Sequence, residues 1–276
     1  MGMKSGRARA LLPTAPVGFF DSGVGGLSVL LAARALLPRE NALYFADSAH
    51  CPYGSKSSDF VRQRALAITG FLLQRGAKAV VVACNSASEA ALEFLRQVFP
   101  GLEVVGVEPA LKVAQGLSRK KKIGVLGTPL TLNGRRFSRL LENFSSGLEV
   151  YTQPVAGLVE RIEAGRFDDR RTAAILRRSL QPLLDKGIDA LVLGCTHYPV
   201  IREQIAAVCG PRVRVIDTGE PVARQLQRRL QARGLLRCGR GGGRVEYFSS
   251  GDPGDVEAVM RAIMADPALQ VSQACL

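Results

Sequence analysis

The feature that most constrains the fold of this chain is a regular alternation of short β-branched runs and amphipathic helical patterns. The run at 79–83, for example, leads through a polar turn into a helical pattern at 87–98. Strands and helices that alternate in this way form parallel sheets with helices on both faces. The sequence therefore predicts an α/β fold.

The predicted elements run from residue 16 to residue 216. The expected strands cover residues 16–20, 41–46, 79–83, 104–107, 123–126, 149–152, 190–193 and 214–216. The expected helices cover residues 27–37, 60–75, 87–98, 109–116, 130–144, 171–184 and 199–208.

A short internal similarity indicates two related halves. The segment VVVACNS, which contains Cys84, resembles LVLGCTH, which contains Cys195, and the two cysteines are 111 positions apart. We therefore expect two similar domains, each a mostly parallel sheet flanked by helices, with the active site between them. The expected boundaries are 17–106 plus 218–276 for the first domain and 107–217 for the second, after a disordered extension at 1–16.

Composition and charge exclude several classes of protein. Hydrophobic residues make up 47% and charged residues 22% of the chain, which is typical of a folded globular protein. The apolar runs are too short to span a membrane, and the N-terminus lacks the apolar stretch of a signal peptide. The six cysteines include no C-x-x-C pair, so we expect reduced thiols in a cytoplasmic protein.

The formal net charge of +13 raises the question of a nucleic-acid partner. The two densest basic clusters, at 119–122 and 233–244, contain no aromatic residues on which bases could stack. We interpret both as solvated loops and expect no nucleic-acid function. The positive field would favour an anionic substrate instead.

Four polar motifs follow predicted strands, and ligands of α/β sheets bind beyond the carboxyl ends of the strands. The motifs are Asp21-Ser22, Cys51-Pro52-Tyr53-Gly54, Cys84-Asn85-Ser86 and Cys195-Thr196-His197.

Cys84 is a candidate reactive thiol. Ser86 and Glu89 have the spacing of a capping box, which predicts that a helix begins directly after Ser86. The thiol would then lie beside a helix N-terminus, whose partial positive charge favours the thiolate. The alternative that Cys84 is an ordinary buried strand-end cysteine stays open.

Cys195 repeats this arrangement. Pro199 suits the first turn of a helix, so the thiol is expected at a strand-to-helix junction. His197, one of two histidines in the chain, could exchange a proton with the thiol or bind a substrate carboxylate. Together with His50 and Cys51 these residues could be drawn as a zinc site, but they lack the close spacing of structural ligands, and no metal is expected.

The turn Gly23-Val24-Gly25-Gly26 joins the first strand to the first helix. It is not a dinucleotide fingerprint, because Ser28 stands in place of the third glycine, and it lacks the ending of a P-loop. We therefore interpret it as a tight turn whose N–H groups could hold a carboxylate.

Taken together, these motifs resemble those of bacterial glutamate racemases, members of the cofactor-independent aspartate/glutamate racemase family. The resemblance covers nearly the whole chain from Val17 onward. It rests on seven motifs in family order: FFDSGVGGLSVL, YFADSAHCPYGSKS, VVACNSASEAAL, GVEPALK, IGVLGTPLTL, LVLGCTHYPVI and VIDTGEPVA. One departure is Ser86, where the family more often has threonine; the hydroxyl is kept, so we expect altered affinity at most.

The resemblance implies roles for individual residues. Cys84 and Cys195 match the two catalytic cysteines, and Asp21, His197 and Glu163 match residues that support them. The matching substrate-binding residues are Asp21, Ser22, Tyr53, Gly54, Asn85, Ser86, Thr128, Thr131, Thr196 and His197. The resemblance also implies that L- and D-glutamate are interconverted without a cofactor and that the product D-glutamate supplies peptidoglycan.

Two opposed thiols suit racemisation, because one base removes the α-proton while the other returns a proton to the opposite face. Asp21 would serve Cys84, and His197 with Glu163 would serve Cys195. Closure of the two domains would exclude water from the carbanion.

Three other interpretations stay open. A related racemase would act on aspartate by the same mechanism. A role as an inhibitor of DNA gyrase, reported for some members of the family, is compatible with the basic charge. A thiol hydrolase would use Cys195 as nucleophile and His197 as base, and it would not need Cys84. We also expect a homodimer.

Overall fold

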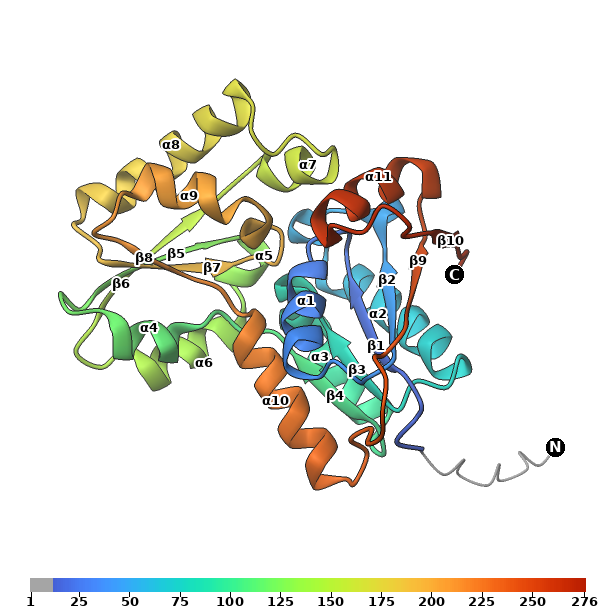
Figure 1. Ribbon diagram of the computed structural model, residues 1–276. Helices are drawn as coiled ribbons and strands as arrows, with labels where there is room; N and C mark the ends of the chain where they lie inside the picture. The colour runs from blue at the N-terminus through green and yellow to red at the C-terminus, as the bar shows by residue number, and fades with distance from the viewer. Residues whose placement is uncertain (1–11) are drawn as a thin grey trace.

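The computed structural model describes residues 12–276, which form two lobes with one sheet in each (Figure 1). Every strand pair in both sheets is parallel. Helices cover both faces of each sheet. The predicted fold class, two domains of mostly parallel sheet flanked by helices, is confirmed.

The first lobe is built on a six-stranded sheet with the order β10-β9-β2-β1-β3-β4. Its strands are β1 (Val17–Asp21), β2 (Ala42–Ala46), β3 (Ala79–Val82), β4 (Glu103–Gly106), β9 (Val245–Ser249) and β10 (Val271–Gln273). Its helices are α1 (Leu27–Leu36), α2 (Ser58–Gln74), α3 (Asn85–Val98), α10 (Gly219–Ala232) and α11 (Pro253–Met264), with the short 3-10 helices η1 (Ser48–His50) and η2 (Tyr53–Ser55). Helices α1, α10 and α11 cover one face of the sheet, and α2 and α3 cover the other.

The second lobe is built on a four-stranded sheet with the order β6-β5-β7-β8. Its strands are β5 (Lys122–Gly127), β6 (Glu149–Pro154), β7 (Ala190–Gly194) and β8 (Arg214–Ile216). Its helices are α4 (Leu111–Leu117), α5 (Pro129–Leu132), α6 (Arg135–Phe144), α7 (Leu158–Glu163), α8 (Arg170–Asp185) and α9 (Arg202–Cys209), with the 3-10 helix η3 (Tyr198–Ile201).

The chain enters the second lobe after β4 and returns to the first at α10, so the first lobe consists of two separate stretches (Figure 1). We propose 17–106 plus 218–276 as the extent of the first lobe and 107–217 as that of the second, because the strands of each sheet fall within these ranges.

The strands that end at the site are buried on both faces. All residues of β1, β3 and β7 are buried, as is usual for central strands of a parallel sheet. Phe19 and Phe20 point to opposite faces of β1 and belong to two different core clusters. Burial of each such side chain contributes about 1.5–3 kcal/mol, so the ends of these strands are firmly fixed.

The structure corrects some predicted elements. The helix expected at 130–144 is two helices, α5 and α6, with a break at Asn133-Gly134. The helix expected at 199–208 begins as η3 and continues as α9. Elements α7, α10, β9, α11 and β10 are not among the predicted helices and strands, although β9 and β10 complete the first sheet.

Part of the expected disordered extension is ordered. Its residues 1–11 lie outside the described part of the chain. Residues 12–16 form a turn in which the Ala15 N–H donates to the Leu12 carbonyl at 3.0 Å. The buried ammonium of Lys78 donates to the Pro13 carbonyl at 2.6 Å and pairs with Glu40 at 2.5 Å, which holds this segment against the sheet.

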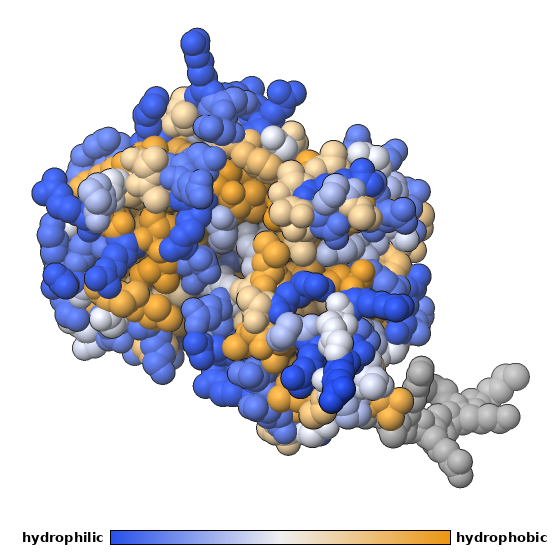
Figure 2. Space-filling model, viewed as in Figure 1, coloured by the Kyte–Doolittle hydropathy of each residue, from blue (hydrophilic) through white to orange (hydrophobic). Residues whose placement is uncertain are grey.

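Over residues 12–276, no helix has both the length and the apolar character needed to cross a membrane. Figure 2 shows hydrophilic and hydrophobic residues interspersed over the visible face, with a hollow between the lobes. The basic clusters at 119–122 and 233–244 are largely exposed.

Candidate active site

Three site residues lie at the carboxyl ends of central strands. Asp21 is the last residue of β1, Cys84 follows β3 and Cys195 follows β7. Because β1 and β3 are neighbours in one sheet and β7 belongs to the other, the two thiols come from different lobes. All three side chains are buried.

Cys84 itself caps the helix that follows it. Helix α3 begins at Asn85, and the Ala87 N–H donates to Cys84 Sγ at 3.4 Å. The predicted capping box is therefore wrong, because the helix starts earlier than the Ser86–Glu89 spacing indicates. Glu89 instead accepts from the N–H groups of Arg136 at 2.9 Å and Phe137 at 3.2 Å, and so caps α6 across the lobes.

The environment of Cys84 favours the neutral thiol. Burial raises the pKa of Cys84 well above its ordinary value, and the negative charge of Asp21 adds to this effect. The hydrogen bond from Ala87 acts in the opposite direction but is outweighed. The effect of the helix N-terminus, which was expected to favour the thiolate, is thus smaller than the opposing effects of burial and of Asp21. Burial also raises the pKa of Asp21, against the opposing charge of His197.

His197 connects Cys195 to a carboxylate. One ring nitrogen, Nδ1, lies 3.8 Å from Cys195 Sγ, and the other, Nε2, lies 2.5 Å from Glu163 Oε1. Burial alone would lower the pKa of His197, but hydrogen bonds with Cys195, Cys51 and Glu163 raise it well above its ordinary value. These contacts therefore favour the protonated ring. Glu163, predicted to support Cys195 together with His197, is in direct contact with the His197 ring.

The glycine-rich turn holds a carboxylate of the chain itself. The Val24 N–H donates to Glu163 Oε1 at 2.7 Å. A Cβ atom at Gly23 would lie 2.0 Å from Glu163 Oε1, and one at Gly25 would lie 2.3 Å from His197 Nδ1. The glycines are thus needed for the close approach of these two side chains.

The two thiols line one small cavity between the lobes. Its volume is about 10 Å³, and it is lined by Ser22, Pro52, Tyr53, Gly54, Cys84, Asn85, Ser86, Thr128, Val159, Cys195, Thr196 and His197. Ten of these twelve residues are predicted site residues; Pro52 and Val159 are additional. Asp21, Glu163 and Thr131 do not line the cavity but contact residues that do.

Hydrogen bonds between site residues hold the lobes together. Thr196 Oγ1 donates to Asp21 Oδ2 at 3.0 Å, and Ser86 Oγ lies 2.9 Å from Thr128 Oγ1. The Thr128 hydroxyl in turn donates to Thr131 Oγ1 at 3.1 Å. The structure is therefore a closed state in which side chains of the site themselves join the two lobes.

Two further predicted residues, Tyr53 and Asn85, differ in whether their polar groups have hydrogen-bond partners. The Tyr53 hydroxyl donates to Asp47, whose carboxylate is also bound by Arg64 at 2.8 and 2.9 Å. The Asn85 amide is buried, and neither its oxygen nor its nitrogen has a hydrogen-bond partner within the described residues. Buried polar groups are normally paired, so the Asn85 amide is available to a ligand of the cavity.

Residues 28–226 match the family model for Asp/Glu/hydantoin racemases, which is well over half of the chain. The chain belongs to the Asp/Glu/hydantoin racemase family. The predicted membership and the predicted enzyme class, an amino-acid racemase, are confirmed.

Individual relatives of the racemase support the same assignment. A glutamate racemase of Pseudomonas paraeruginosa is 49% identical over 247 residues, which is 90% of this chain and 93% of that protein. A glutamate racemase isoform from Bacillus anthracis has a similar structure, with a TM-score of 0.85, 31% identity and coverage of 95% and 97% of the two chains. The structure of the Francisella tularensis glutamate racemase in complex with D-glutamate has a TM-score of 0.83, with 28% identity and coverage of 96% and 98%.

The predicted catalytic and binding residues of the racemase did not include Cys51, although it has a reactive side chain and lies beside them. Cys51, from the CPYG motif, lies 3.8 Å from Ser22 Oγ and contacts His197. Burial raises the pKa of the Cys51 thiol to about 12. The motif places Cys51 next to Tyr53 and Gly54, and this proximity was the available signal.

Proposed function

We propose that this racemase interconverts L- and D-glutamate, with Cys84 and Cys195 as the two opposed acid–base groups. The observation that carries the proposal is that two buried thiols, one from each lobe, line the same cavity. Each follows a central strand, so their positions are fixed by the cores of two different sheets.

Glutamate is the substrate that the relatives favour. The Pseudomonas paraeruginosa and Bacillus anthracis relatives bear the name glutamate racemase, and the Francisella tularensis relative was crystallised with D-glutamate. The net charge of +13 also favours a dicarboxylate. The names of these relatives support glutamate over aspartate, whereas the charge suits either dicarboxylate.

The surroundings of the two thiols suit opposite protonation states. Burial and the charge of Asp21 keep Cys84 protonated, so it can donate a proton to a carbanion. The His197 imidazolium, 3.8 Å from Cys195 Sγ, can stabilise a thiolate at that position. In this direction Cys195 removes the α-proton and Cys84 supplies the new one. The reverse direction exchanges the two roles.

Polar groups of the cavity would bind the substrate. The unpaired Asn85 amide can donate to one carboxylate of glutamate and accept from its ammonium. The hydroxyls of Ser86, Thr128 and Thr196 now bond to other protein groups and could exchange these partners for substrate oxygens. Such preorganised donors stabilise a developing carbanion in a cavity that excludes water.

Substrate entry requires the lobes to separate. A cavity of about 10 Å³ holds about one water molecule, which is far smaller than glutamate. The bonds from Thr196 to Asp21 and from Ser86 to Thr128 must break on opening. We therefore propose that binding alternates with opening and closure of the lobes.

The test is proton NMR of L- and D-glutamate in deuterated water. The wild-type protein should exchange the α-proton for deuterium and convert either enantiomer into the other. Cys84→Ser and Cys195→Ser should each lower racemisation by at least ~100-fold, because each removes one acid–base group. Cys209→Ser, which alters a buried cysteine outside the cavity, is the matched control and should retain activity.

The other interpretations give different results. Exchange with aspartate but not glutamate would keep the mechanism and change the substrate. A thiol hydrolase would tolerate Cys84→Ser and form a covalent intermediate on Cys195. Absence of exchange with both amino acids would contradict the racemase proposal.

The remaining expectations stay predictions. They are supply of D-glutamate to peptidoglycan, a cytoplasmic location, a homodimer, catalysis without a cofactor and a DNA gyrase partner. No described feature favours the gyrase interaction.

A further inference from the structure

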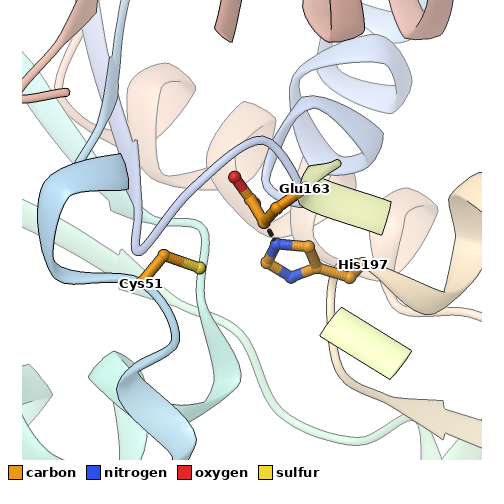
Figure 3. A group of neighbouring side chains, drawn as sticks. All are labelled: Cys51, Glu163 and His197. Carbon is orange, nitrogen blue, oxygen red and sulfur yellow. Dashed lines mark hydrogen bonds and ion pairs between the residues drawn. The ribbon is translucent and has the colours of Figure 1, made fainter. Parts of the chain in front are cut away.

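Three side chains with different metal-binding atoms meet beside the cavity: Cys51, Glu163 and His197 (Figure 3). One sulfur, one carboxylate oxygen and one ring nitrogen from them all lie within 4.8 Å of one another. The residues come from the loop after η1, from the end of α7 and from the segment after β7. This group differs from the set considered from the sequence, because His50 is bonded to Asp47 instead.

The donor set suits a zinc-like ion. Thiolate, imidazole and carboxylate are the three ligand types that Zn²⁺ takes in proteins. Ca²⁺ and Mg²⁺ prefer oxygen ligands only, so a sulfur and a nitrogen donor select against them. One thiolate and one carboxylate also balance the charge of a divalent ion.

The geometry requires only a small adjustment. His197 Nε2 and Glu163 Oε1 are now 2.5 Å apart and hydrogen-bonded. Two ligand atoms bound to zinc at about 2.0–2.1 Å in tetrahedral geometry lie roughly 3.3 Å apart, so this pair would have to separate slightly. Both hydrogen bonds of the Glu163 carboxylate within the described chain are accepted by Oε1, which leaves Oε2 as the ligand atom.

The site would keep one open position. Cys195 lies against Nδ1, on the other nitrogen of the His197 ring, so it is not a ligand when Nε2 binds the ion. Three protein ligands and a fourth position for water are typical of exchangeable zinc sites and not of closed structural ones. Glu163 and Cys51 are only partly buried, which gives the ion access.

We propose that Cys51, Glu163 and His197 form an inhibitory site for Zn²⁺ or a similar divalent transition-metal ion. The ion binds His197 Nε2 in place of its proton, Glu163 Oε2, and Cys51 as the thiolate; the two displaced protons leave to solvent. The ring of His197, whose Nδ1 lies 3.8 Å from Cys195 Sγ, is then held by the ion and can no longer exchange protons through Nε2. The inhibitory effect rests on the proposed function, whereas ion binding does not.

Cobalt absorption tests the site without measuring activity. Metal-free, reduced full-length protein titrated with Co²⁺ should develop a thiolate-to-cobalt charge-transfer band at one ion per chain. Cys51→Ser and Cys51→Ala should remove this band and weaken binding at least ~10-fold, because loss of a ligand costs no less than loss of an outer-shell partner. Cys238→Ser and Cys275→Ser, which alter exposed thiols, should leave it unchanged. Glu163→Gln should weaken binding but keep the band.

Zinc inhibition of racemisation completes the test. Zn²⁺ should inhibit the wild-type protein reversibly, with recovery on addition of a chelator. Inhibition of Cys51→Ser, expressed relative to its own rate without Zn²⁺, should require at least ~10-fold more Zn²⁺ than inhibition of the wild type. A charge-transfer band that persists in both Cys51 variants, or is absent from the wild type, would overturn the proposed site. Cobalt binding through Cys51 in a protein that does not exchange the α-proton of glutamate would retain the site and reject the proposed function.

Discussion

Glu163 binds both His197 and the backbone of the opposite lobe through the same oxygen. Its Oε1 atom lies 2.5 Å from His197 Nε2 and accepts from the Val24 N–H at 2.7 Å. His197 and Glu163 belong to the second lobe, and Val24 belongs to the first. The charge state of the histidine is therefore coupled to closure of the lobes.

Glu163→Gln should shift the pH dependence of racemisation. Glu163 is one of the groups that raise the pKa of His197, so loss of its charge lowers that pKa toward the ordinary value. If the imidazolium is the active form, activity is lost as the pH rises through this pKa, and the loss occurs at lower pH in the variant. At pH 8 we expect kcat/KM to fall by about 10-fold or more, short of the full loss of an acid–base group. The pH profile of kcat/KM measures this.

Glu160→Gln, on the same helix but exposed, is the control and should leave the pH profile of kcat/KM unchanged.

The raised pKa of His197 also predicts an effect on stability. The charged His197 contributes free energy of unfolding that is fully present below the unfolded pKa of about 6.5 and is lost as the pH rises through the folded value. Equal pH profiles of kcat/KM in wild type and Glu163→Gln would contradict the first expectation, and an equal pH dependence of the free energy of unfolding would contradict the second.

Gly54→Ala should prevent full closure. A Cβ atom at Gly54 would lie 2.6 Å from Thr128 Cβ, across the boundary between the lobes, and neither atom can move away freely. A displacement of about 1 Å at the site can lower kcat/KM on the order of 100-fold. Gly70→Ala is the matched control, because a Cβ atom there meets nothing within 4 Å. Steady-state kinetics of the two variants compare these effects, and a fully active Gly54→Ala protein would argue against closure as part of catalysis.

Asn85→Ala should increase the stability of the protein and decrease its activity. The Asn85 amide is buried without a partner, so its removal should raise the free energy of unfolding by about 1 kcal/mol while racemisation is lost or KM rises strongly. Urea unfolding and kinetics measure the two effects. Asn41→Ala provides the opposite case, since the Asn41 amide accepts from Arg237 and Arg244; it should destabilise the protein by about 1–3 kcal/mol. A destabilised Asn85→Ala protein with normal KM would show that the amide has a structural role only.

Lys78→Met should destabilise the protein by about 3–5 kcal/mol, because it leaves the buried Glu40 without its ion-pair partner. Lys78→Met/Glu40→Gln should recover part of this loss, since the second change removes the unpaired charge. Both proteins should retain normal kcat at a temperature where they are folded, because the pair lies outside the cavity. Chemical denaturation of the single and double variants gives the coupling energy, and a value near zero would contradict the assigned ion pair.

The predictable parts of the fold are those with strong local signals. Strands such as β3 and β7 are uninterrupted apolar runs followed by cysteines, and the position of these cysteines beyond the carboxyl ends of the strands follows from this pattern. The start of α3 was misassigned because a thiol can cap a helix as Cys84 does, and the Ser86–Glu89 spacing gave a competing signal. The raised pKa of Cys84 depends on burial against Asp21, which local sequence does not determine.

Other features depend on contacts between distant segments. Glu163, at the end of the short helix α7, is separated from Val24 by 139 positions in the sequence. Only the folded chain brings the two residues together. The association of Cys51 with His197 and Glu163 likewise joins three separate segments. The glycines of the turn after β1 can be recognised in the sequence. The sequence does not show that they make room for the side chains of Glu163 and His197.

The position of β9 between β2 and β10 has a consequence for synthesis of the protein. The ribosome completes β2 at Ala46 but does not reach β9 until Val245, about 200 residues later. At 5–20 residues per second this interval lasts roughly 10–40 s. Throughout it, the edge of β2 that later pairs with β9 is without its neighbour, while the complete sequence of the four-stranded sheet emerges. The nascent chain is therefore most exposed to misassembly on the ribosome at an edge that the finished protein conceals.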